Sequence, residues 1–399
     1  MKLIERPIYL QRLKDLEGTP DIKVITGVRR CGKSELMKAY IRFLSENVPD
    51  ANVIFIDLFD LKYEALKDYH KLYAYVEERY DGGKRNYVFI DEVQMCKGFE
   101  LAVNSLHTSK KYDIYVTGSN AFLLSSDLAT LFTGRYIEIH VFHFSFAVYC
   151  AYRGDETDVY KLLEEYFING GLAGSYPYRT ERDRVAYIND VFNTIANRDL
   201  TAKYKLADTV LLEQITDYLM DNVSNLTSPG NISKTLNEND AGTNNKTVKN
   251  YIKRLCDAFV FYDVKRYDIK GKKYLKTSEK YYLSDQGFRF ARLGRRNLDL
   301  GRIYENIVCV ELLRRGYDVY VGKLYKKEVD FVAIKGNEKL YIQVCADISG
   351  PETAQREYEP LLKIRDAYPK MIIANTRFQT YDHEGIIIAD MANWLLGKA

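Results

Sequence analysis

The segment DIKVITGVRRCGKSELMKAY, residues 21–40, decides how the first part of this chain folds. Its β-branched run at 22–25 predicts a buried strand, and apolar residues at helical spacing from residue 36 onward predict an amphipathic helix. Between them, residues 27–34 read G-x-x-x-x-G-K-S. A strand before this motif and a helix after it indicate a phosphate-binding P-loop, whereas the motif elsewhere would indicate only a glycine turn.

The loop predicts a phosphate site built largely from backbone. Gly27 and Gly32 permit backbone angles that other residues resist, so consecutive N–H groups can turn toward phosphate. We expect Lys33 to reach the β- and γ-phosphates and Ser34 to hold Mg²⁺, at a helix start whose dipole is positive. ATP, ADP and Mg²⁺ are therefore the expected ligands. The expected nucleotide-binding residues are Gly27, Val28, Arg29, Arg30, Cys31, Gly32, Lys33 and Ser34.

Composition describes an ordinary globular protein. A chain of 399 residues is long enough for about two or three domains with separate cores. The net charge of +3 is too small to indicate an acidic partner for the molecule as a whole. No segment approaches the roughly 18–20 apolar residues of a membrane span, and residues 1–18 lack the apolar core of a signal peptide. We therefore expect a cytoplasmic protein without a membrane partner.

The six cysteines indicate reduced thiols, because they are scattered and form no C-x-x-C pair. Neither a disulfide framework nor a zinc site is expected. Cys31 lies inside the P-loop near Lys33, where a thiol could be acidified and sense the redox state. We favour the simpler role of a small side chain that fills the loop.

A second chemical signal follows the apolar run YVFI at 87–90, which predicts a buried parallel strand. This run ends in Asp91 and Glu92. Downstream of a P-loop the pattern is typical of a Walker B element, in which Asp91 positions Mg²⁺ and Glu92 orients and deprotonates the attacking water. An acidic turn after an ordinary strand is the alternative when the pattern is taken alone.

Two further residues are candidates for the hydrolytic site. The predicted strand at 113–117 runs toward Asn120, which is expected to lie beside the γ-phosphate; the alternative is a turn asparagine. Arg135 precedes a predicted strand at 137–142 and is a candidate cation for the transition state, acting in cis or from a neighbouring subunit. A plain surface arginine is the alternative for Arg135.

The motifs together carry a family resemblance. GVRRCGKS, IDEVQ, VTGSNAFLLSS and LFTGRY occur in the order in which AAA-type ATPases place P-loop, Walker B, sensor and arginine segments. The chain resembles a group of bacterial and archaeal AAA-type proteins that end in a domain of unknown function. That resemblance implies an ATPase with an α/β P-loop core over residues 1–150, and it implies no settled biological role.

Residues 151–292 predict a helical lid followed by a winged helix-turn-helix. The lid is expected over 151–205 and the winged helix over 206–292. Helices are predicted at 211–223, 231–236 and 243–258, followed by strands at 259–265 and 274–283. Three helices and then a hairpin is the order of a winged helix, whose third helix would enter the major groove.

The third helix and the hairpin are basic. Between residues 246 and 276 there are ten basic residues and three acidic ones, a concentration of positive charge that phosphate backbones attract. Double-stranded DNA is the expected partner, and protein contact through a solvated basic face is the alternative. The expected nucleic-acid residues are Lys246, Lys249, Lys253, Arg254, Lys272 and Lys273.

Residues 298–399 resemble a restriction-endonuclease-like α/β domain. A predicted helix at 302–315 carries Glu305, and the following strands carry Asp330 and Gln343. In that arrangement Gln343 stands where an acid belongs and Cys345 where a lysine belongs. Losing a metal ligand and a water-activating cation should abolish metal-assisted hydrolysis. We expect a degenerate site, unless a lysine from elsewhere, such as Lys363 on the next helix, replaces the missing one.

The sequence therefore predicts an α/β protein: an AAA-type core with a lid, then a winged helix and a nuclease-like domain. ATP hydrolysis would switch this platform on DNA, in a chain that can form homo-oligomers. One alternative is a nucleotide-gated protein-interaction switch that never contacts DNA. A second is an ATP-dependent nuclease, which the departures at Gln343 and Cys345 disfavour.

Overall fold

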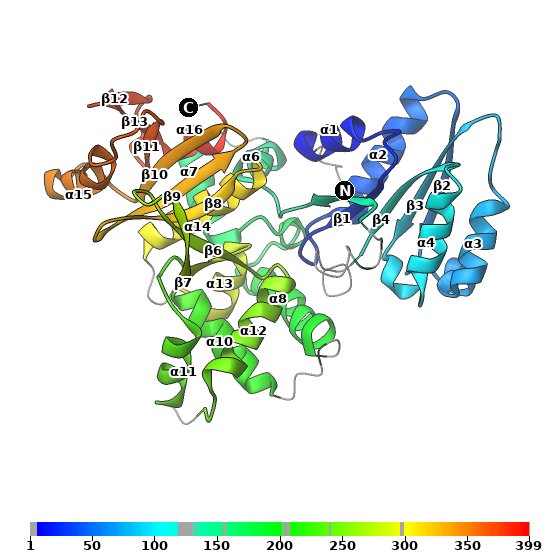
Figure 1. Ribbon diagram of the computed structural model, residues 1–399, viewed down its shortest axis with the longest axis horizontal. Helices are drawn as coiled ribbons and strands as arrows, with labels where there is room; N and C mark the ends of the chain where they lie inside the picture. Colours follow the sequence, from blue (N-terminus) through cyan, green and yellow to red (C-terminus); the bar gives the residue numbers. More distant parts are fainter. Residues whose placement is uncertain are drawn as a thin grey trace. The chain divides into compact units, whose positions relative to one another are not determined.

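The computed structural model describes residues 6–118, 130, 132, 134–154, 157–201, 204, 208–238, 241–295 and 299–398, without the side chains of 198, 199 and 274–278. The chain divides into two compact units, Met1–His143 and Phe144–Ala399. Figure 1 shows the elements of each unit. No helix among the described residues has both the length and the apolar character needed to cross a membrane.

The first unit is built on a parallel five-stranded sheet in the order β2-β3-β4-β1-β5. Its strands are β1 (Ile22–Thr26), β2 (Ala51–Asp57), β3 (Arg85–Asp91), β4 (Tyr112–Thr117) and β5 (Tyr136–His140). These lie close to the predicted ranges, and the expected α/β P-loop core is confirmed. Because all five strands run the same way, their carboxyl ends meet at one edge of the sheet.

Helices cover both faces of this sheet (Figure 1). They are α1 (Pro7–Asp15), α2 (Lys33–Asn47), α3 (Tyr69–Glu77) and α4 (Phe99–Thr108), with short 3₁₀ turns at Leu61–Lys67 and Val93–Met95. Val88 and Ile90 of β3 belong to the apolar cluster that contains α3 and α4. Phe89, which points the other way, lies 6.1 Å from the ring of Tyr40 on α2. Burial on both faces explains why β3 reads as an unbroken apolar run.

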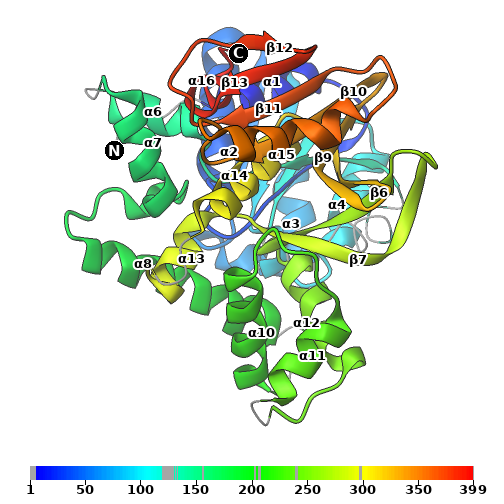
Figure 2. The same cartoon turned by 90° about the vertical axis from the view of Figure 1, so that its left-hand side faces the viewer.

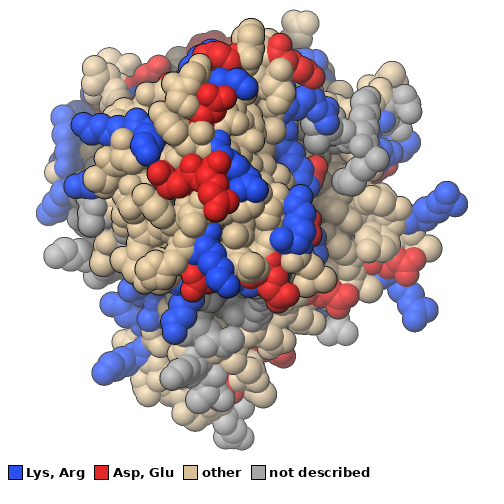
Figure 3. Space-filling view, turned by 90° about the vertical axis from the view of Figure 1, so that its right-hand side faces the viewer, with Lys and Arg blue, Asp and Glu red and all other residues tan. Residues whose placement is uncertain are grey.

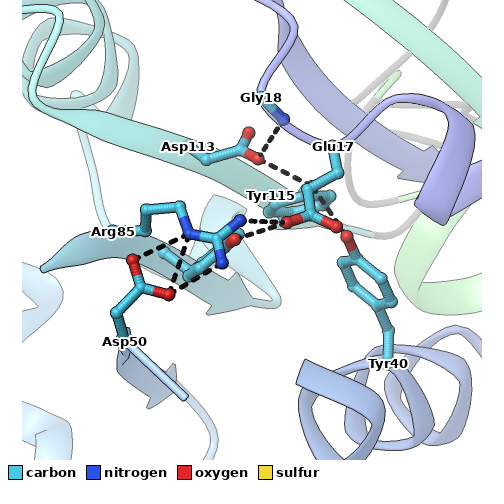
Figure 4. Close-up of polar contacts among 8 residues, drawn as sticks. Glu17, Gly18, Tyr40, Asp50, Arg85, Asp113 and Tyr115 are labelled. Atoms are coloured by element: carbon cyan, nitrogen blue, oxygen red, sulfur yellow. Dashed lines mark hydrogen bonds and ion pairs between the residues drawn. The ribbon is translucent and has the colours of Figure 1, made fainter. Parts of the chain in front are cut away.

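Ion pairs close the amino edge of the five-stranded sheet (Figure 4). Arg85 at the start of β3 donates to Asp50, with an N–O distance of 2.7 Å, and lies 3.4 Å from Glu17. Lys23 of β1 donates at 2.5 Å to Asp113 of β4. Charges at this edge therefore satisfy one another.

The second unit contains an eight-stranded mixed sheet in the order β12-β13-β11-β10-β9-β8-β6-β7. Its strands are β6 (Phe261–Asp268), β7 (Lys273–Leu283), β8 (Asp318–Leu324), β9 (Lys327–Lys335), β10 (Glu338–Cys345), β11 (Lys370–Ala374), β12 (Tyr381–His383) and β13 (Ile386–Asp390). Strands β8, β9 and β10 are successive antiparallel neighbours, and β11 and β13 continue the sheet in parallel. The last three strands, β11, β12 and β13, are short and were not predicted from sequence.

The helices of the second unit include those expected for the lid and the helix-turn-helix. They are α6 (Phe146–Arg153), α7 (Val159–Asn169), α8 (Glu181–Thr194), α10 (Thr209–Asp221), α11 (Pro229–Asn237), α12 (Asn245–Asp257), α13 (Gln286–Leu293), α14 (Leu300–Arg314), α15 (Pro351–Leu362) and α16 (Met391–Leu395), with a π-helical turn at Ile195–Thr201. The cap of α11 is Ser228, which accepts from Asn231 N–H, and Pro229 takes the first turn. The helix therefore begins two residues before the predicted range of 231–236, because proline fixes an earlier start.

The β6–β7 hairpin joins the sheet of the C-terminal part. Strand β6 pairs antiparallel with β7 and parallel with β8, in the register Arg266↔Val321 to Asp268↔Lys323. Figure 2 shows α10, α11 and α12 grouped beside this hairpin. The ranges predicted as two domains, 206–292 and 298–399, thus share one sheet. Local sequence patterns do not reveal a pairing between strands so far apart.

The helices predicted as a lid also pack within the second unit. Tyr166 and Phe167 of α7 belong to the same buried cluster as Tyr304 of α14 and Trp394 of α16. The rings of Phe167 and Tyr304 lie 4.7 Å apart. The boundary between the units falls at His143, slightly before the predicted end of the core at residue 150.

Candidate active site

The P-loop follows β1 and is shaped by glycine. Gly27 has a φ of +141°, and a Cβ there would lie 2.2 Å from the carbonyl oxygen of Val141 and 2.8 Å from Cys31 Sγ. Gly32 has a φ of +95° and precedes α2. A side chain at Gly27 would therefore displace the loop from the end of β5. Cys31 is buried against Gly27.

Lys33 is the first residue of α2, and its side chain is buried. Its Nζ donates to the carbonyl oxygens of Gly27 at 2.9 Å and Val28 at 3.3 Å. Among the described residues, no carboxylate forms an ion pair with it. No side chain caps the helix at Gly32 either, so the first N–H groups of α2 remain available to an anion.

The N-terminal segment braces this loop. Arg6 is buried and donates from Nη1 to the carbonyl of Cys31 at 2.8 Å and from Nη2 to the carbonyl of Phe142 at 2.6 Å. Its guanidinium lies 4.4 Å from the ring of Tyr9, whose hydroxyl accepts from the N–H of Phe142. Arg6 thereby ties the middle of the P-loop to the end of β5. Sequence reasoning missed it because its contacts are 25 and 136 residues away.

Asp91 ends β3 at the carboxyl edge of the sheet and is buried. The Thr117 hydroxyl at the end of β4 donates to Asp91 Oδ1, and Ser34 of the P-loop lies beside the same carboxyl group. Burial raises the pKa of Asp91, and the carboxylates of Glu92 and Asp57 raise it further, whereas the hydroxyls of Thr117 and Ser34 lower it. A carboxylate buried among like charges favours a cation beside it.

Glu92 follows β3 in a left-handed conformation, with a φ of 55°. Its backbone N–H donates to Thr117 Oγ1 at 3.0 Å, and its Oε2 accepts from Gln94 Nε2. The left-handed backbone at Glu92 directs its side chain away from the line of the strand. The hydrogen bond from Gln94 then orients its carboxylate. Thr117 therefore holds both acids, although the sequence indicated only that it ends a strand.

His140 ends β5 near the P-loop lysine. Its Nδ1 lies 3.3 Å from Thr26 Oγ1, and its ring packs edge-on against Phe142 with centroids 4.5 Å apart. Burial, together with the charge of Lys33, lowers the pKa of His140 to about 3. His140 is therefore neutral at physiological pH and adds no charge to the site.

The fold brings Lys33, Ser34, Asp91 and Glu92 to the carboxyl ends of β1 and β3. Asn120 lies outside the described residues. Arg135 is exposed and precedes β5, and its carbonyl accepts from Ile22 N–H at the amino edge of the sheet. Arg135 therefore lies at the opposite edge of the parallel sheet from the P-loop, and its role in cis or in trans stays a prediction.

The donor set suits a nucleotide-bound Mg²⁺. Within the described part of the chain, no three His, Cys, Asp or Glu side chains are arranged to hold a metal by themselves. Mg²⁺ usually keeps several waters and takes one or two protein ligands together with substrate phosphates. Ser34 and Asp91, which lie near each other at this edge of the sheet, can supply such a pair.

The basic residues of α12 do not form a uniform set. Lys246, Lys249 and Lys253 are exposed, and no ion pair with them occurs among the described residues. Arg254 instead pairs with Asp257 at 3.1 Å and lies 3.9 Å from the ring of Tyr204. Its charge is thus engaged within the protein.

The turn of the hairpin adds Lys272 and Lys273, which are both exposed. The face drawn in Figure 3, by comparison, carries Lys and Arg next to Asp and Glu.

The predicted nuclease-like residues do meet in space. Gln343 Oε1 accepts from Asp330 N–H at 2.7 Å, and burial together with the charge of Glu305 raises the pKa of Asp330. The lysine beside them, however, is Lys280 of β7, whose Nζ lies 2.8 Å from Glu305. Lys363, the replacement considered from sequence, pairs with Glu359 on the surface. The structure thus places Lys363 in a surface ion pair just after α15 and Lys280 beside Glu305.

Known families match two parts of the chain. Residues 19–150 match a family described as an AAA domain, and residues 160–299 match one described as a domain of unknown function. An uncharacterized protein of Haemophilus influenzae is 38% identical over 399 residues, which cover 99% of both chains. An uncharacterized protein of Methanocaldococcus jannaschii is 25% identical over 406 residues, which cover 96% of this chain and 86% of the relative.

Among solved structures, a Walker-type ATPase of Pyrococcus abyssi superimposes with a TM-score of 0.44 and 14% identity, over 72% of this chain and 95% of that one. The Orc1 protein of Aeropyrum pernix in complex with DNA gives a TM-score of 0.32 and 10% identity, over 79% and 94%.

Proposed function

The chain belongs to the same family as the Haemophilus influenzae protein and carries an AAA domain over residues 19–150, and from this premise we propose that it binds and hydrolyses ATP with Mg²⁺. The observation that carries the proposal is the position of Lys33. It is buried at the start of α2, and within the described part of the chain it bonds only to neutral carbonyls of its own loop. A triphosphate would supply the negative charge that these described neighbours do not.

In this proposal each group at the carboxyl edge has one role. Lys33 holds the β- and γ-phosphates, while Ser34 and Asp91 hold Mg²⁺. Glu92, oriented by Gln94, takes the proton of the attacking water. Asn120 keeps its proposed place beside the γ-phosphate.

Arg135 is proposed to act only from a neighbouring subunit in a homo-oligomer. Its exposure and its place at the amino edge support this assignment. A cation brought to the γ-phosphate by a partner would stabilise the charge of the transition state.

We further propose that ATP hydrolysis switches a DNA-binding platform in the second unit. Lys246, Lys249 and Lys253 support this, since they are exposed on one helix without carboxylate partners in the described chain. Lys272 and Lys273 would add phosphate contacts from the hairpin. Arg254 is not included, because Asp257 and Tyr204 hold it.

The test is titration of a DNA duplex at several salt concentrations, with and without ATP. Each phosphate contact releases counterions, so affinity should fall steeply with salt, with a log–log slope of about −0.9 per contact. A Lys249→Ala/Lys253→Ala variant should reduce that slope by about 2. An Arg179→Ala/Arg182→Ala variant removes the same charge from exposed positions elsewhere and should leave it unchanged. Weak, salt-independent binding would exclude the DNA-binding proposal.

A nucleotide-gated protein-interaction switch is the second candidate. Pairing of β6 with β8 favours it, because a hairpin joined to one end of an eight-stranded sheet is less able to adapt to a DNA groove than a free wing. In that case ATP would change the affinity for a protein partner, and duplex DNA would leave ATP turnover unchanged.

A further inference from the structure

The acidic cluster of the nuclease-like domain already contains a cation of its own. Lys280 of β7 places Nζ 2.8 Å from Glu305 of α14 and 2.7 Å from Glu328 of β9. Tyr282, two residues along β7, donates from its hydroxyl to Glu305 Oε1 at 2.7 Å. Three elements thus meet around one ammonium group.

Lys280 and Glu305 are buried, so water screens the ion pair between them only weakly. The Lys280 side chain is 4% exposed and that of Glu305 is 11% exposed. Burial lowers the pKa of Lys280, but the carboxylates of Glu305, Asp330 and Glu328 outweigh it and raise that pKa above its usual value. Lys280 is therefore charged at every physiological pH, and the acids around it are its counterions.

The backbone fixes Lys280 in this place. Asn306, next to Glu305 on α14, accepts from Leu283 N–H at 2.6 Å and donates to the Leu283 carbonyl at 2.8 Å. These bonds hold the end of β7 against α14. Since β7 belongs to the hairpin, the lysine comes from the segment before the nuclease-like domain and not from its own strands.

The remaining metal-ligand positions are also used by the protein. Gln343 accepts from Asp330 N–H and donates from Nε2 to Glu357 at 2.8 Å. Asp330 Oδ2 accepts from Val344 N–H at 2.8 Å. The amide oxygen of Gln343 thus faces backbone where an acidic ligand would face a metal. A divalent ion does not fit this donor set while the ammonium is present.

We propose that Lys280 is the resident cation of this cluster, in the place that a divalent metal takes in the endonuclease-like arrangement, and that it fastens the hairpin to α14. The domain then needs no metal for its structure and has no open coordination position for metal-dependent cleavage. The competing assignment makes Lys280 the water-activating lysine of a metal-dependent nuclease, and that assignment requires a metal at Asp330.

The test is Mn²⁺ binding to the full-length, nucleotide-free chain, followed by the electron paramagnetic resonance signal of free Mn²⁺. The single variant Asp330→Asn should bind the same number of Mn²⁺ ions per chain as the wild type. A loss of one Mn²⁺ per chain in Asp330→Asn would overturn the proposal and support the nuclease assignment. This comparison keeps Lys280 and so does not depend on folding of a Lys280 variant.

A second arm removes the ammonium. Lys280→Gln should bind one Mn²⁺ per chain more than the wild type does at the same Mn²⁺ concentration, because the carboxylates lose their counterion. The gain should disappear in Lys280→Gln/Asp330→Asn, and Lys363→Gln, an exposed control, should gain nothing. A folded Lys280→Gln chain without the extra Mn²⁺ would contradict the proposal.

Discussion

Lys33 and Lys280 are both buried, yet their surroundings differ in kind. Lys33 donates to two backbone carbonyls, and the acids at the same sheet edge bond to other groups. Lys280 donates directly to carboxylates. A lysine whose hydrogen-bond acceptors are neutral keeps a positive charge that an anionic ligand can neutralise. A lysine that donates to carboxylates is already neutralised within the folded protein. The first arrangement suits binding and the second suits structure.

The same contrast holds for the two edges of the five-stranded sheet. At the amino edge, Arg85 and Lys23 pair with Asp50 and Asp113. At the carboxyl edge, Asp91 and Lys33 are not paired with each other in the described structure. At the amino edge these charged side chains neutralise one another, so they leave no net charge for a ligand. At the carboxyl edge this lysine and aspartate are where a nucleotide and its metal would bind.

Lys33→Ala should produce the largest effect on function and a small one on stability. It removes charge-assisted contacts to phosphate of about 3 kcal/mol or more, so the ATP affinity should fall at least about a hundredfold. Isothermal titration with ATP and Mg²⁺ measures this. The free energy of unfolding should fall by only about 1 kcal/mol, the value of hydrogen bonds to neutral acceptors.

Lys71→Ala is the matched control, since Lys71 is an exposed lysine of α3. It should leave both quantities unchanged. ATP binding by Lys33→Ala at wild-type affinity would remove the distinction between the two lysines.

Lys280→Gln should show the reverse pattern. It leaves Glu305 as an uncompensated buried charge, which costs about 3–5 kcal/mol of unfolding free energy. Urea unfolding without divalent ions measures the loss, and ATP affinity should stay at the wild-type value. Tyr282→Phe removes only one hydrogen bond to Glu305 and should cost about 1–2 kcal/mol. Equal unfolding free energies for the wild type, Lys280→Gln and Tyr282→Phe would mean that Lys280 does not anchor the hairpin.

Asp91→Asn should have the smallest effect on stability. It should stabilise the folded chain, whereas Lys280→Gln and Tyr282→Phe destabilise it. Because burial raises the pKa of Asp91, the charged carboxylate destabilises the folded state at pH values above that raised pKa. The amide removes this cost and keeps an oxygen that accepts from Thr117. At pH 8, without nucleotide or Mg²⁺, the thermal midpoint should therefore rise by about 2 °C, as about 1 kcal/mol would produce.

The gain for Asp91→Asn should shrink as the pH falls through the raised pKa, because the wild-type carboxyl is then protonated too. Differential scanning calorimetry at pH 8 and pH 5 provides the comparison. A lower midpoint than wild type at pH 8 would show that Asp91 is stabilised as a carboxylate in the fold.

Local patterns in the sequence were enough for the P-loop and the β3 acids. The residues 27–34 and Asp91–Glu92 are each contiguous, and the strand and helix around them are set by neighbours along the chain. The parallel sheet followed from apolar runs buried on both faces. Strands and loops of this kind can be predicted from the residues of their own segment.

Contacts between distant segments could not be predicted in this way. Arg6 reaches the P-loop from the N-terminal segment, and Lys280 reaches Glu305 only because β7 lies against α14. The pairing of β6 with β8 depends on register between separate elements, which no local period encodes. Cys345 led us to predict a missing lysine at its position, and nothing in the sequence indicated that β7 brings Lys280 beside Glu305.

The central claim, that this chain is an ATPase with Glu92 as its base, is tested most directly by steady-state ATP hydrolysis compared with ATP binding. Glu92→Gln should bind ATP as the wild type does and turn it over at least about a hundredfold more slowly, because only proton transfer from water is lost. Glu46→Gln, an exposed change on α2, should hydrolyse at the wild-type rate. Equal turnover in the wild type and in Glu92→Gln would contradict the account.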